Sequence, residues 1–297
     1  MSDPVPAATA ARPIHVLLTF DDNFWAPAYA VMRSICLFTR RKTDLVFHLA
    51  HLGLSEPHRR DLEAIREEFG ATLVWYDLAH SRLFADVAAR IRPDRRLPNI
   101  IYARLLVDQL IDPGIERILY LDCDTLVRAP IEELYEAEMG GKPIAAVRDT
   151  VGAFIVGGRD LKDKRDLFDI ADPYFNSGVV LIDIPKWRET KIIDTLERRI
   201  ADGTMARLYG DQDFLNLVFK KNWQRLPAMW NLIDARSVHE GLDPNLVHYT
   251  GPQKPWHLVS LVAFRRVYRH TMTNELFYRF MRHRWKRYWQ KRLRLPR

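Results

Sequence analysis

Residues 118–127 read ILYLDCDTLV, and this stretch decides the fold. Its first four residues are largely apolar, as in a strand that is buried inside a sheet. Asp122 and Asp124 then follow on either side of Cys123. In a strand, residues two apart point to the same side, with Cα atoms roughly 6.6 Å apart, whereas the residue between them points away. The stretch therefore predicts a buried strand that brings two carboxylates, without the thiol, to its C-terminal end.

Strand-like and helix-like segments alternate through most of the sequence, which favours an α/β fold with a largely parallel sheet. Besides the strand that opens 118–127, we expect strands at 14–20, 45–52, 72–76, 144–147, 178–184 and 246–249. Expected helices cover 27–38, 55–70, 101–111, 131–138, 192–201 and 211–219. We interpret residues 1–13 as a flexible N-terminus, 14–262 as one domain and 263–297 as a tail.

Charge is distributed unevenly along the chain. The 297 residues have a net charge of +7, yet residues 265–297 alone contain twelve Lys or Arg and one acid, Glu275. The body that precedes them is therefore slightly acidic. We expect the C-terminal segment to bind something anionic.

Cysteine usage and hydropathy indicate a cytoplasmic protein. Cys36 and Cys123 lie far apart and form no CxxC pair, which argues against a disulfide scaffold and for a reducing compartment. Residues 1–13 lack the hydrophobic stretch of a signal peptide, and no run of about 18 apolar residues occurs.

The pair of aspartates allows several interpretations. At the C-terminal edge of a parallel sheet, two converging carboxylates suit a hard divalent cation, although they could also cap the next turn. A haloacid-dehalogenase-like phosphohydrolase has such a pair near the start of its domain, with Thr or Val two residues after the second Asp. Here the pair lies mid-chain and that position is Leu126. The Gly-rich motifs of phosphate-binding loops and dinucleotide enzymes are missing. A third interpretation is a metal-dependent nucleotide-sugar transferase, in which the pair would hold a cation on a diphosphate.

Six motifs in order resemble glycosyltransferase family 8, and the bacterial lipopolysaccharide α-galactosyl- and α-glucosyltransferases within it. They are LLTFDDNFW (17–25), IYARLL (101–106), YLDCDTLV (120–127), YFNSGVVLIDIPKWRE (174–189), GDQDFLN (210–216) and VHYTGPQKPWH (247–257). The resemblance implies a GT-A fold, in which helices flank a Rossmann-like mixed sheet. It also implies a UDP-hexose donor, Mn²⁺ or Mg²⁺, and transfer with retention of anomeric configuration.

The same resemblance, taken residue by residue, implies the metal site. Asp122, Asp124 and His248 match the metal ligands, and an imidazole beside two carboxylates shifts the preference from Mg²⁺ toward Mn²⁺. Gly251 and Lys254 follow His248 in one motif and match a close backbone approach and a contact with the donor diphosphate.

The resemblance also implies a donor pocket. Thr19, Asp21, Asn23 and Phe24 match the uridine pocket, where Phe24 replaces the more usual Tyr and keeps a stacking face without the hydroxyl. Other matches concern the sugar and the reaction centre. Arg104 would contact the donor sugar or diphosphate, Asn176, Ser177 and Gly178 would line the sugar, and Asp149, Asp211 and Gln212 would form the catalytic group. Asp211 and Gln212 could instead cap the helix that they open.

The C-terminal segment places aromatic residues at helical spacing among arginines. Phe277, Met281, Trp285 and Tyr288 would share one face of a helix that begins near Asn274. Such a basic, aromatic helix suits an anionic membrane surface, and no nucleic-acid recognition motif accompanies the charge. We therefore expect a protein that is peripheral on the inner face of the cytoplasmic membrane.

Taken together, the sequence predicts a retaining UDP-hexose transferase that acts on a cell-envelope glycolipid or oligosaccharide, of the lipopolysaccharide-core type. Two alternatives stay open. One is a glycogenin-like transferase with a soluble acceptor, and the other is a non-catalytic nucleotide-sugar binding protein.

Overall fold

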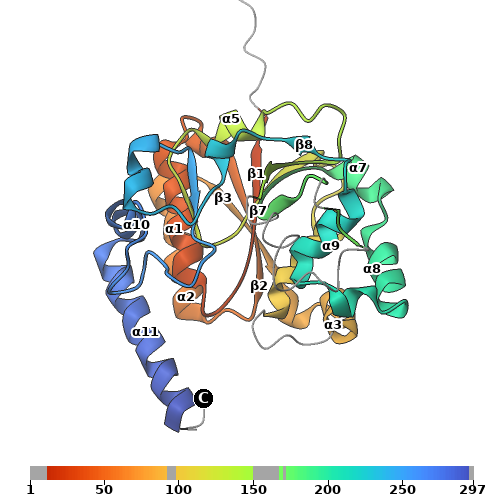
Figure 1. Cartoon of the computed structure of the whole chain (residues 1–297). Helices are drawn as coiled ribbons and strands as arrows, with labels where there is room; N and C mark the ends of the chain where they lie inside the picture. The colour runs from red at the N-terminus through yellow and green to blue at the C-terminus, as the bar shows by residue number, and fades with distance from the viewer. Residues whose placement is uncertain (1–11, 92–97, 150–166, 170–171, 294–297) are drawn as a thin grey trace, which may run out of the picture.

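The computed structural model describes residues 12–91, 98–149, 167–169 and 172–293 (Figure 1). Of the expected flexible N-terminus, residues 1–11 lie outside the described part. At the centre is a seven-stranded sheet with the order β3-β2-β1-β4-β7-β6-β8. Its strands are β1 (Ile14–Asp21), β2 (Leu45–Leu52), β3 (Thr72–Asp77), β4 (Arg117–Leu121), β6 (Ile144–Arg148), β7 (Phe175–Asp183) and β8 (Gln224–Arg225).

The sheet is mixed, as the family resemblance implies. β3, β2, β1 and β4 run parallel, whereas β7 is antiparallel to both β4 and β6. The first residues of β7 therefore lie at the same edge of the sheet as the C-terminal ends of β1 and β4. Polar side chains from three strands meet at this edge.

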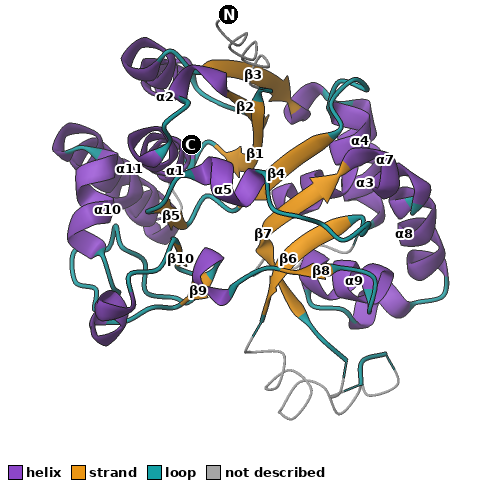
Figure 2. Ribbon diagram, turned by 90° about the horizontal axis from the view of Figure 1, so that it is seen from above, coloured by secondary structure: helices purple, strands orange, loops and turns teal. Residues whose placement is uncertain are grey.

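Helices cover both faces of the sheet (Figure 2). One face packs against α1 (Trp25–Phe38), α2 (Glu56–Phe69), α5 (Ile131–Tyr135), α10 (Arg265–Met272) and α11 (Asn274–Leu293). The other packs against α3 (Arg82–Arg90), the 3₁₀ helix η3 (Asn99–Leu106), α4 (Val107–Leu110), α7 (Ile184–Glu189), α8 (Ile192–Ala201) and α9 (Gly210–Phe219). Shorter 3₁₀ turns are η1 (Lys42–Asp44), η2 (Leu78–His80), η4 (Thr204–Arg207), η5 (Ala228–Trp230) and η6 (Ser237–Leu242).

The side chains of β1 enter two apolar cores, one on each face of the sheet. Val16, Leu18 and Phe20 enter the core beneath α1 and α2, whereas Leu17 enters the opposite core. A strand buried on both faces is apolar throughout, which is why its sequence shows no alternation. Cys36 and Cys123 are both free and buried.

The expected strand at the start of 118–127 is confirmed, but it ends before the two aspartates, so the prediction that they share one side of a strand is wrong. β4 ends at Leu121, residues 122–124 turn, and Thr125–Val127 form β5 in a second sheet of order β5-β10-β9. β10 (Leu246–His248) lies in the middle of that sheet, between β5 and β9 (Leu232–Ile233). The turn therefore connects the two sheets, and the register of β10 places His248 opposite Thr125.

The expected helix at 101–111 is also wrong in form. The chain instead makes the 3₁₀ helix η3 and then the single α-turn α4. All residues from Tyr102 to Leu106 are buried, including Arg104. The apolar spacing suggested an amphipathic α-helix with a solvated face, but this segment has no such face.

The first half of α11 packs into the core of the body. Leu276, Phe277 and Phe280 are at most 5% exposed, and they join the same apolar cluster as α1. Arg279 donates two hydrogen bonds to Asp61 on α2, of 2.7 and 2.8 Å. The packed region thus extends past residue 262, and α11 projects from the body only in its second half (Figure 1). No described helix is both long enough and apolar enough to span a bilayer.

Candidate active site

A cleft of about 800 Å³ opens where β1 and β4 end and β7 begins. It brings together most of the predicted site residues: Thr19, Asp21, Phe24, Arg104, Asp122, Asp124, Asp149, Asn176, Ser177, Asp211, Gln212, His248, Gly251 and Lys254. Asn23 faces a neighbouring cavity instead, and Gly178 lies beneath the predicted metal ligands. The topology explains this convergence, since the parallel strands β1 and β4 end, and the antiparallel strand β7 begins, at the same edge of the sheet.

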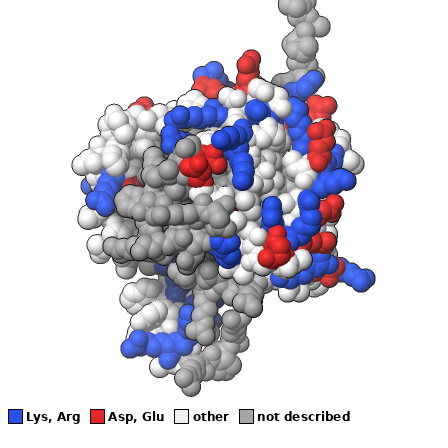
Figure 3. All heavy atoms as spheres, turned by 45° about the vertical axis from the view of Figure 1, so that its right-hand side comes forward, with Lys and Arg blue, Asp and Glu red and all other residues white. Residues whose placement is uncertain are grey.

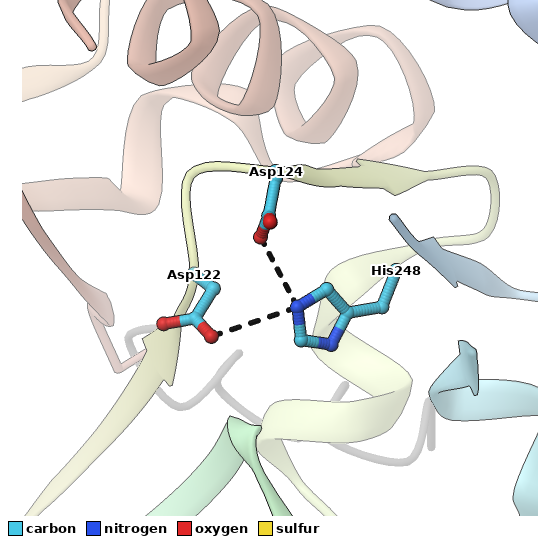
Figure 4. Close-up of side chains that lie close together, drawn as sticks. All are labelled: Asp122, Asp124 and His248. Atoms are coloured by element: carbon cyan, nitrogen blue, oxygen red, sulfur yellow. Dashed lines mark hydrogen bonds and ion pairs between the residues drawn. The ribbon is translucent and has the colours of Figure 1, made fainter. Parts of the chain in front are cut away.

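Three predicted metal ligands converge in this cleft. One ligand atom each from Asp122, Asp124 and His248 lies within 4.8 Å of the others. His248 Nε2 is 3.1 Å from Asp124 Oδ1 and 3.5 Å from Asp122 Oδ2 (Figure 4). The two carboxylates approach because the chain turns at Cys123, and not because they share one side of a strand. Two carboxylates and an imidazole form a donor set that fits Mn²⁺ or Mg²⁺.

Gly178 leaves room for this group. A Cβ atom there would lie 2.1 Å from His248 Cε1 and 2.6 Å from Asp122 Oδ2. A side chain at position 178 would therefore collide with His248 and Asp122, so these two residues can lie as they do only beside a glycine.

A second layer of side chains orients the ligands. The Tyr120 hydroxyl donates to Asp122 Oδ1 over 2.7 Å and Arg104 Nη2 donates to the same oxygen over 2.8 Å, so Oδ2 is directed at His248. His248 Nδ1 lies 3.1 Å from the Asn231 side-chain oxygen. That contact fixes Nδ1 as the protonated nitrogen and leaves the Nε2 lone pair free to bind a cation.

Charges within the group favour ionisation of Asp124. Burial opposes it, but the charge of His248 and the hydrogen bonds from His248 and Lys254 hold the pKa of Asp124 below its usual range. Conversely, burial disfavours the imidazolium, yet the two carboxylates raise the pKa of His248 above its ordinary value. A cation that binds here would replace a proton on His248.

Lys254 and Gly251 are placed by loop contacts. Lys254 Nζ donates to Asp124 Oδ2 over 2.8 Å and also to the Tyr249 carbonyl oxygen. The Gly251 amide donates to Asp234 Oδ1, and a Cβ on Gly251 would come 3.0 Å from that oxygen. The ammonium group therefore lies beside a predicted metal ligand, where a diphosphate that binds the same cation would reach it.

Arg104 lines the cleft but is almost fully buried. Only 5% exposed, it pairs with Asp122 Oδ1 and Asp211 Oδ2, both at 2.8 Å, and its guanidinium stacks on the Tyr120 ring. Burial raises the pKa of Asp211 to about 6, although the charge of Arg104 opposes this. Arg104 thus links a predicted metal ligand to a predicted catalytic carboxylate.

The Gln212 carboxamide is held on both sides. Its oxygen accepts from the Ser177 amide and from Asn176 Nδ2, both at 3.0 Å, and its nitrogen donates to Asp149 Oδ2 at 3.0 Å. The N-cap residue of α9 is Tyr209, so Asp211 and Gln212 occupy the first turn and do not cap the helix.

Asn176 connects this group to the metal ligands. Its side-chain oxygen accepts from Asn231 Nδ2 over 2.9 Å, and Asn231 in turn contacts His248. The predicted catalytic group and the predicted metal ligands are therefore parts of one hydrogen-bond network.

The predicted uridine end of the cleft is open. Asn23 donates to Asp21 from both its backbone and its side chain, which closes a tight turn after β1. Phe24 is 38% exposed and contacts the Trp256 ring edge to face, so part of its ring faces the cleft. The Thr19 hydroxyl lies 3.1 Å from the Tyr120 hydroxyl and belongs to the network beneath the metal ligands.

Reasoning from the sequence missed Tyr120, Tyr174 and Asn231. Tyr174 lines the cleft, donates to Asp213 over 2.5 Å and lies 3.4 Å from Gln212 Nε2. Tyr120 could have been found, because it precedes Asp122 by two residues on a strand. Nothing in the sequence around Asn231 identifies it.

Comparison with known proteins agrees with this geometry. The model of glycosyl transferase family 8 matches residues 15–259. The chain belongs to glycosyl transferase family 8. It is therefore a glycosyltransferase of a retaining family, and the predicted family is confirmed.

Relatives of known structure or annotation lie at low identity. The crystal structure of galactosyltransferase LgtC in complex with donor and acceptor sugar analogues has a TM-score of 0.71 and 25% identity, over 87% of this chain and 95% of that one. This likeness confirms the GT-A fold. General stress protein A of Bacillus subtilis is 24% identical over 88% of this chain and 93% of its own length.

A lipopolysaccharide 1,2-glucosyltransferase of Escherichia coli is 27% identical over 59% of this chain and 54% of its own length. The chain spans 93% of the length of general stress protein A but only 26% of that of a probable glycosyl transferase of Streptococcus gordonii.

Proposed function

We propose that this family 8 protein transfers a hexose, galactose or glucose, from a UDP-sugar to a cell-envelope glycolipid of the lipopolysaccharide-core type. The observation that carries the proposal is the single network that joins Asp122, Asp124 and His248 to Asn176 and Gln212 in one cleft. A nucleotide-sugar transferase needs both groups side by side, one for the diphosphate and one for the sugar.

The metal ligands and Lys254 would act on the leaving group. Mn²⁺ or Mg²⁺ held by Asp122, Asp124 and His248 would supply Lewis-acid stabilisation of the leaving diphosphate. Lys254 would turn from Asp124 toward a phosphate oxygen and add a positive charge there. Phe24 would stack on uracil while Asp21 and Asn23 hold the turn beneath it, and Thr19 would support the pocket through Tyr120.

The sugar would lie against Asp149, Asn176, Ser177 and Gln212, with Gly178 beneath. Because the Gln212 oxygen already accepts hydrogen bonds from Ser177 and Asn176, its lone pairs are poorly available for nucleophilic attack. We therefore favour attack of the acceptor on the same face as the departing UDP, with Gln212 and Asp211 stabilising positive charge on the sugar. A glycosyl adduct trapped on either residue of the wild-type enzyme would overturn this mechanism.

The second half of α11 supports membrane association of the same enzyme. Trp285 and Trp289 are 59% and 50% exposed and lie four residues apart, with Arg282 and Lys286 nearby. Exposed tryptophans among basic residues suit the surface of an anionic bilayer at the cytoplasmic side. Replacing both tryptophans by serine should release the full-length protein from vesicles that contain anionic phospholipid, and unchanged sedimentation would refute the membrane proposal.

The proposed reaction can be tested with a donor panel. UDP-glucose, UDP-galactose and UDP-N-acetylglucosamine are each incubated with the full-length protein and Mn²⁺, and released UDP is measured with and without EDTA. We expect one hexose donor to dominate and EDTA to abolish release. UDP release that needs no divalent cation would refute the metal role, whereas donor binding without any release would indicate a binding protein.

A further inference from the structure

A second cavity, of about 1120 Å³, lies between α11 and the loop that follows β10. Loop residues Pro252, Lys254, Trp256 and His257 form one wall, and α11 forms the other. Phe24, Pro252 and Lys254 line this cavity and the donor cleft alike, so the two spaces adjoin. We call this second space the basic cavity.

One face of α11 changes character where the helix leaves the body. Leu276, Phe277 and Phe280 are buried against the core. The residues that continue this stripe at intervals of three and four are His283, Arg284, Arg287, Tyr288 and Lys291, and all of them line the basic cavity. The face that anchors the helix is apolar, and its continuation over the cavity is cationic.

The positive charges of the basic cavity are not balanced. Within the described part of the chain, no carboxylate lies within ion-pair distance of Arg284, Lys286, Arg287 or Lys291, whereas Arg279 on the same helix pairs with Asp61. The cavity's acid, Asp22, already accepts hydrogen bonds from His58 and the Ser55 amide.

Arg284 shows the imbalance most clearly. It is half-buried, its hydrogen-bond partner is His257 Nε2 at 3.2 Å, and its guanidinium lies over Phe280. Burial of a cation without a counter-charge carries a free-energy cost that a bound anion would remove.

We propose that the basic cavity binds a phosphate-bearing group of the acceptor, so that the substrate of this enzyme is a phosphorylated glycan. This inference rests on the proposed transferase function. The donor diphosphate would meet the metal ligands and Lys254, and the four cations of α11 lie beyond what it requires. A concave space with Phe24, Trp256 and Tyr288 in its walls suits a discrete sugar phosphate better than the flat surface of a bilayer.

The test uses fructose 1,6-bisphosphate as the anionic probe and fructose as the uncharged control, each titrated calorimetrically into the full-length protein without metal. We expect the bisphosphate to bind. The triple variant Arg284→Gln, Arg287→Gln, Lys291→Gln should weaken that binding about tenfold or more, because charge-assisted hydrogen bonds are lost.

A matched variant separates a site from overall charge. Arg266→Gln, Arg282→Gln, Arg292→Gln removes the same charge from exposed positions that do not line the cavity. We expect its affinity for the probe to stay within about twofold of the wild type. Equal weakening in the two triple variants, or loss of probe binding only in the donor-cleft variant Asp124→Asn, would overturn the inference.

The proposed function is tested separately by release of UDP from the wild type. If UDP is released with Mn²⁺ but the probe does not bind through the cavity residues, only the inference fails. If no donor yields UDP, the proposed function fails, and the inference of a phosphorylated acceptor fails for the same reason. A last measurement compares the binding of the wild type and of the cavity variant to anionic vesicles. If the probe does not bind and the cavity variant no longer binds these vesicles, the cavity binds lipid headgroups and the inference is overturned.

Discussion

The two adjoining cavities differ in the balance of the charges that line them. In the donor cleft, Asp122 and Asp211 share Arg104, and Asp124 meets both His248 and Lys254. In the basic cavity, the cations of α11 face a wall that adds Lys254 and His257 and offers little negative charge. On the face of the body that Figure 3 shows, Lys and Arg lie interspersed with Asp and Glu. A cleft with internal pairs is preorganised for a cation and its ligand, whereas an unbalanced one depends on the ligand for its counter-charge.

The largest effect on the donor cleft is expected from Asp124→Asn, which removes a carboxylate from that cleft and none from the basic cavity. The amide is nearly isosteric, but it binds a divalent cation poorly and no longer pairs with Lys254. We expect metal-dependent UDP release to fall by at least about 100-fold, with the fold intact. Activity is measured across a Mn²⁺ series, and circular dichroism checks the fold.

Binding of the bisphosphate probe provides the control for this variant. Asp124 does not line the basic cavity, and its loss frees Lys254, which does, so probe affinity should not fall below that of the wild type. Substantial activity without Asp124 at moderate Mn²⁺ would contradict its role as a ligand.

The next largest effect is expected from Gly178→Ala. A single methyl group would enter the space in which Asp122 and His248 meet, at 2.6 and 2.1 Å from their atoms. The ligands must move apart, so affinity for Mn²⁺ should drop by about tenfold or more, and unfolding free energy by about 1–3 kcal/mol.

Electron paramagnetic resonance titration of free Mn²⁺ measures this affinity without relying on catalysis. Gly203→Ala is a suitable control, since a Cβ there meets nothing within 4 Å, although its positive φ adds some strain. Wild-type Mn²⁺ affinity in the Gly178 variant would show that the cation binds elsewhere.

Much of the donor cleft could be predicted from the sequence, because its residues lie in short motifs at strand ends. Parallel strands end at one edge, so Asp21 and Asp122 meet there, whereas Asn176 reaches the same edge only because β7 runs antiparallel to β4. The change of sheet at Cys123 was not predicted, because the apolar residues on either side of 122–124 give no sign that they belong to different sheets. Tyr120 and Asn231 were missed because their roles depend on tertiary neighbours.

The basic cavity could not be predicted from the sequence. Helical spacing placed Phe277, Met281, Trp285 and Tyr288 on one face, yet Phe277 is buried while Trp285 is 59% exposed. Which face of α11 docks is decided by contacts such as Arg279 with Asp61, which join segments 218 residues apart. The charge of the tail was visible in the sequence, but the concave surface that it lines was not.

A moderate effect is expected from Asp61→Asn, which weakens the docking of α11 without touching either cavity. Asp61 accepts two hydrogen bonds from Arg279 and one from the Trp25 indole, and its side chain is 14% exposed. Loss of this charge should lower the free energy of unfolding by about 1–3 kcal/mol. Probe affinity should fall a few-fold because α11 forms one wall of the basic cavity, while Mn²⁺ affinity should not change.

Glu68→Gln is the matched control for this variant. Glu68 also receives two hydrogen bonds from an arginine, Arg33, but that pair connects α1 to α2 rather than α2 to α11. An equal loss of probe affinity in both variants would mean that general destabilisation, and not the docking of α11, governs the cavity.

The smallest effect, a pH dependence, should distinguish the cavities most finely. Burial, together with neighbouring positive charges, lowers the pKa of His257 and of His283 below the ordinary value of 6.5. His257 faces Lys254 and Arg284; His283 faces His58 and Asp22 of the body and Lys286 and Arg287 of its own helix. Both rings are therefore mainly neutral at pH 7.

An anion bound in the basic cavity favours the protonated rings, so binding takes up protons and should strengthen as pH falls below 6.5. With inorganic sulfate, whose own charge stays constant, we expect affinity about two- to threefold higher at pH 5.5 than at pH 7.5.

The same two histidines make the stability of the protein depend on pH in the opposite direction when no anion is bound. The lowered pKa values mean that the unfolded chain binds more protons than the folded one, so stability is lost as pH falls from 6.5 toward those values. The double variant His257→Gln, His283→Gln should reduce the pH dependence of both sulfate affinity and stability. If sulfate affinity keeps its full pH dependence in this variant, the titrating groups lie outside the basic cavity.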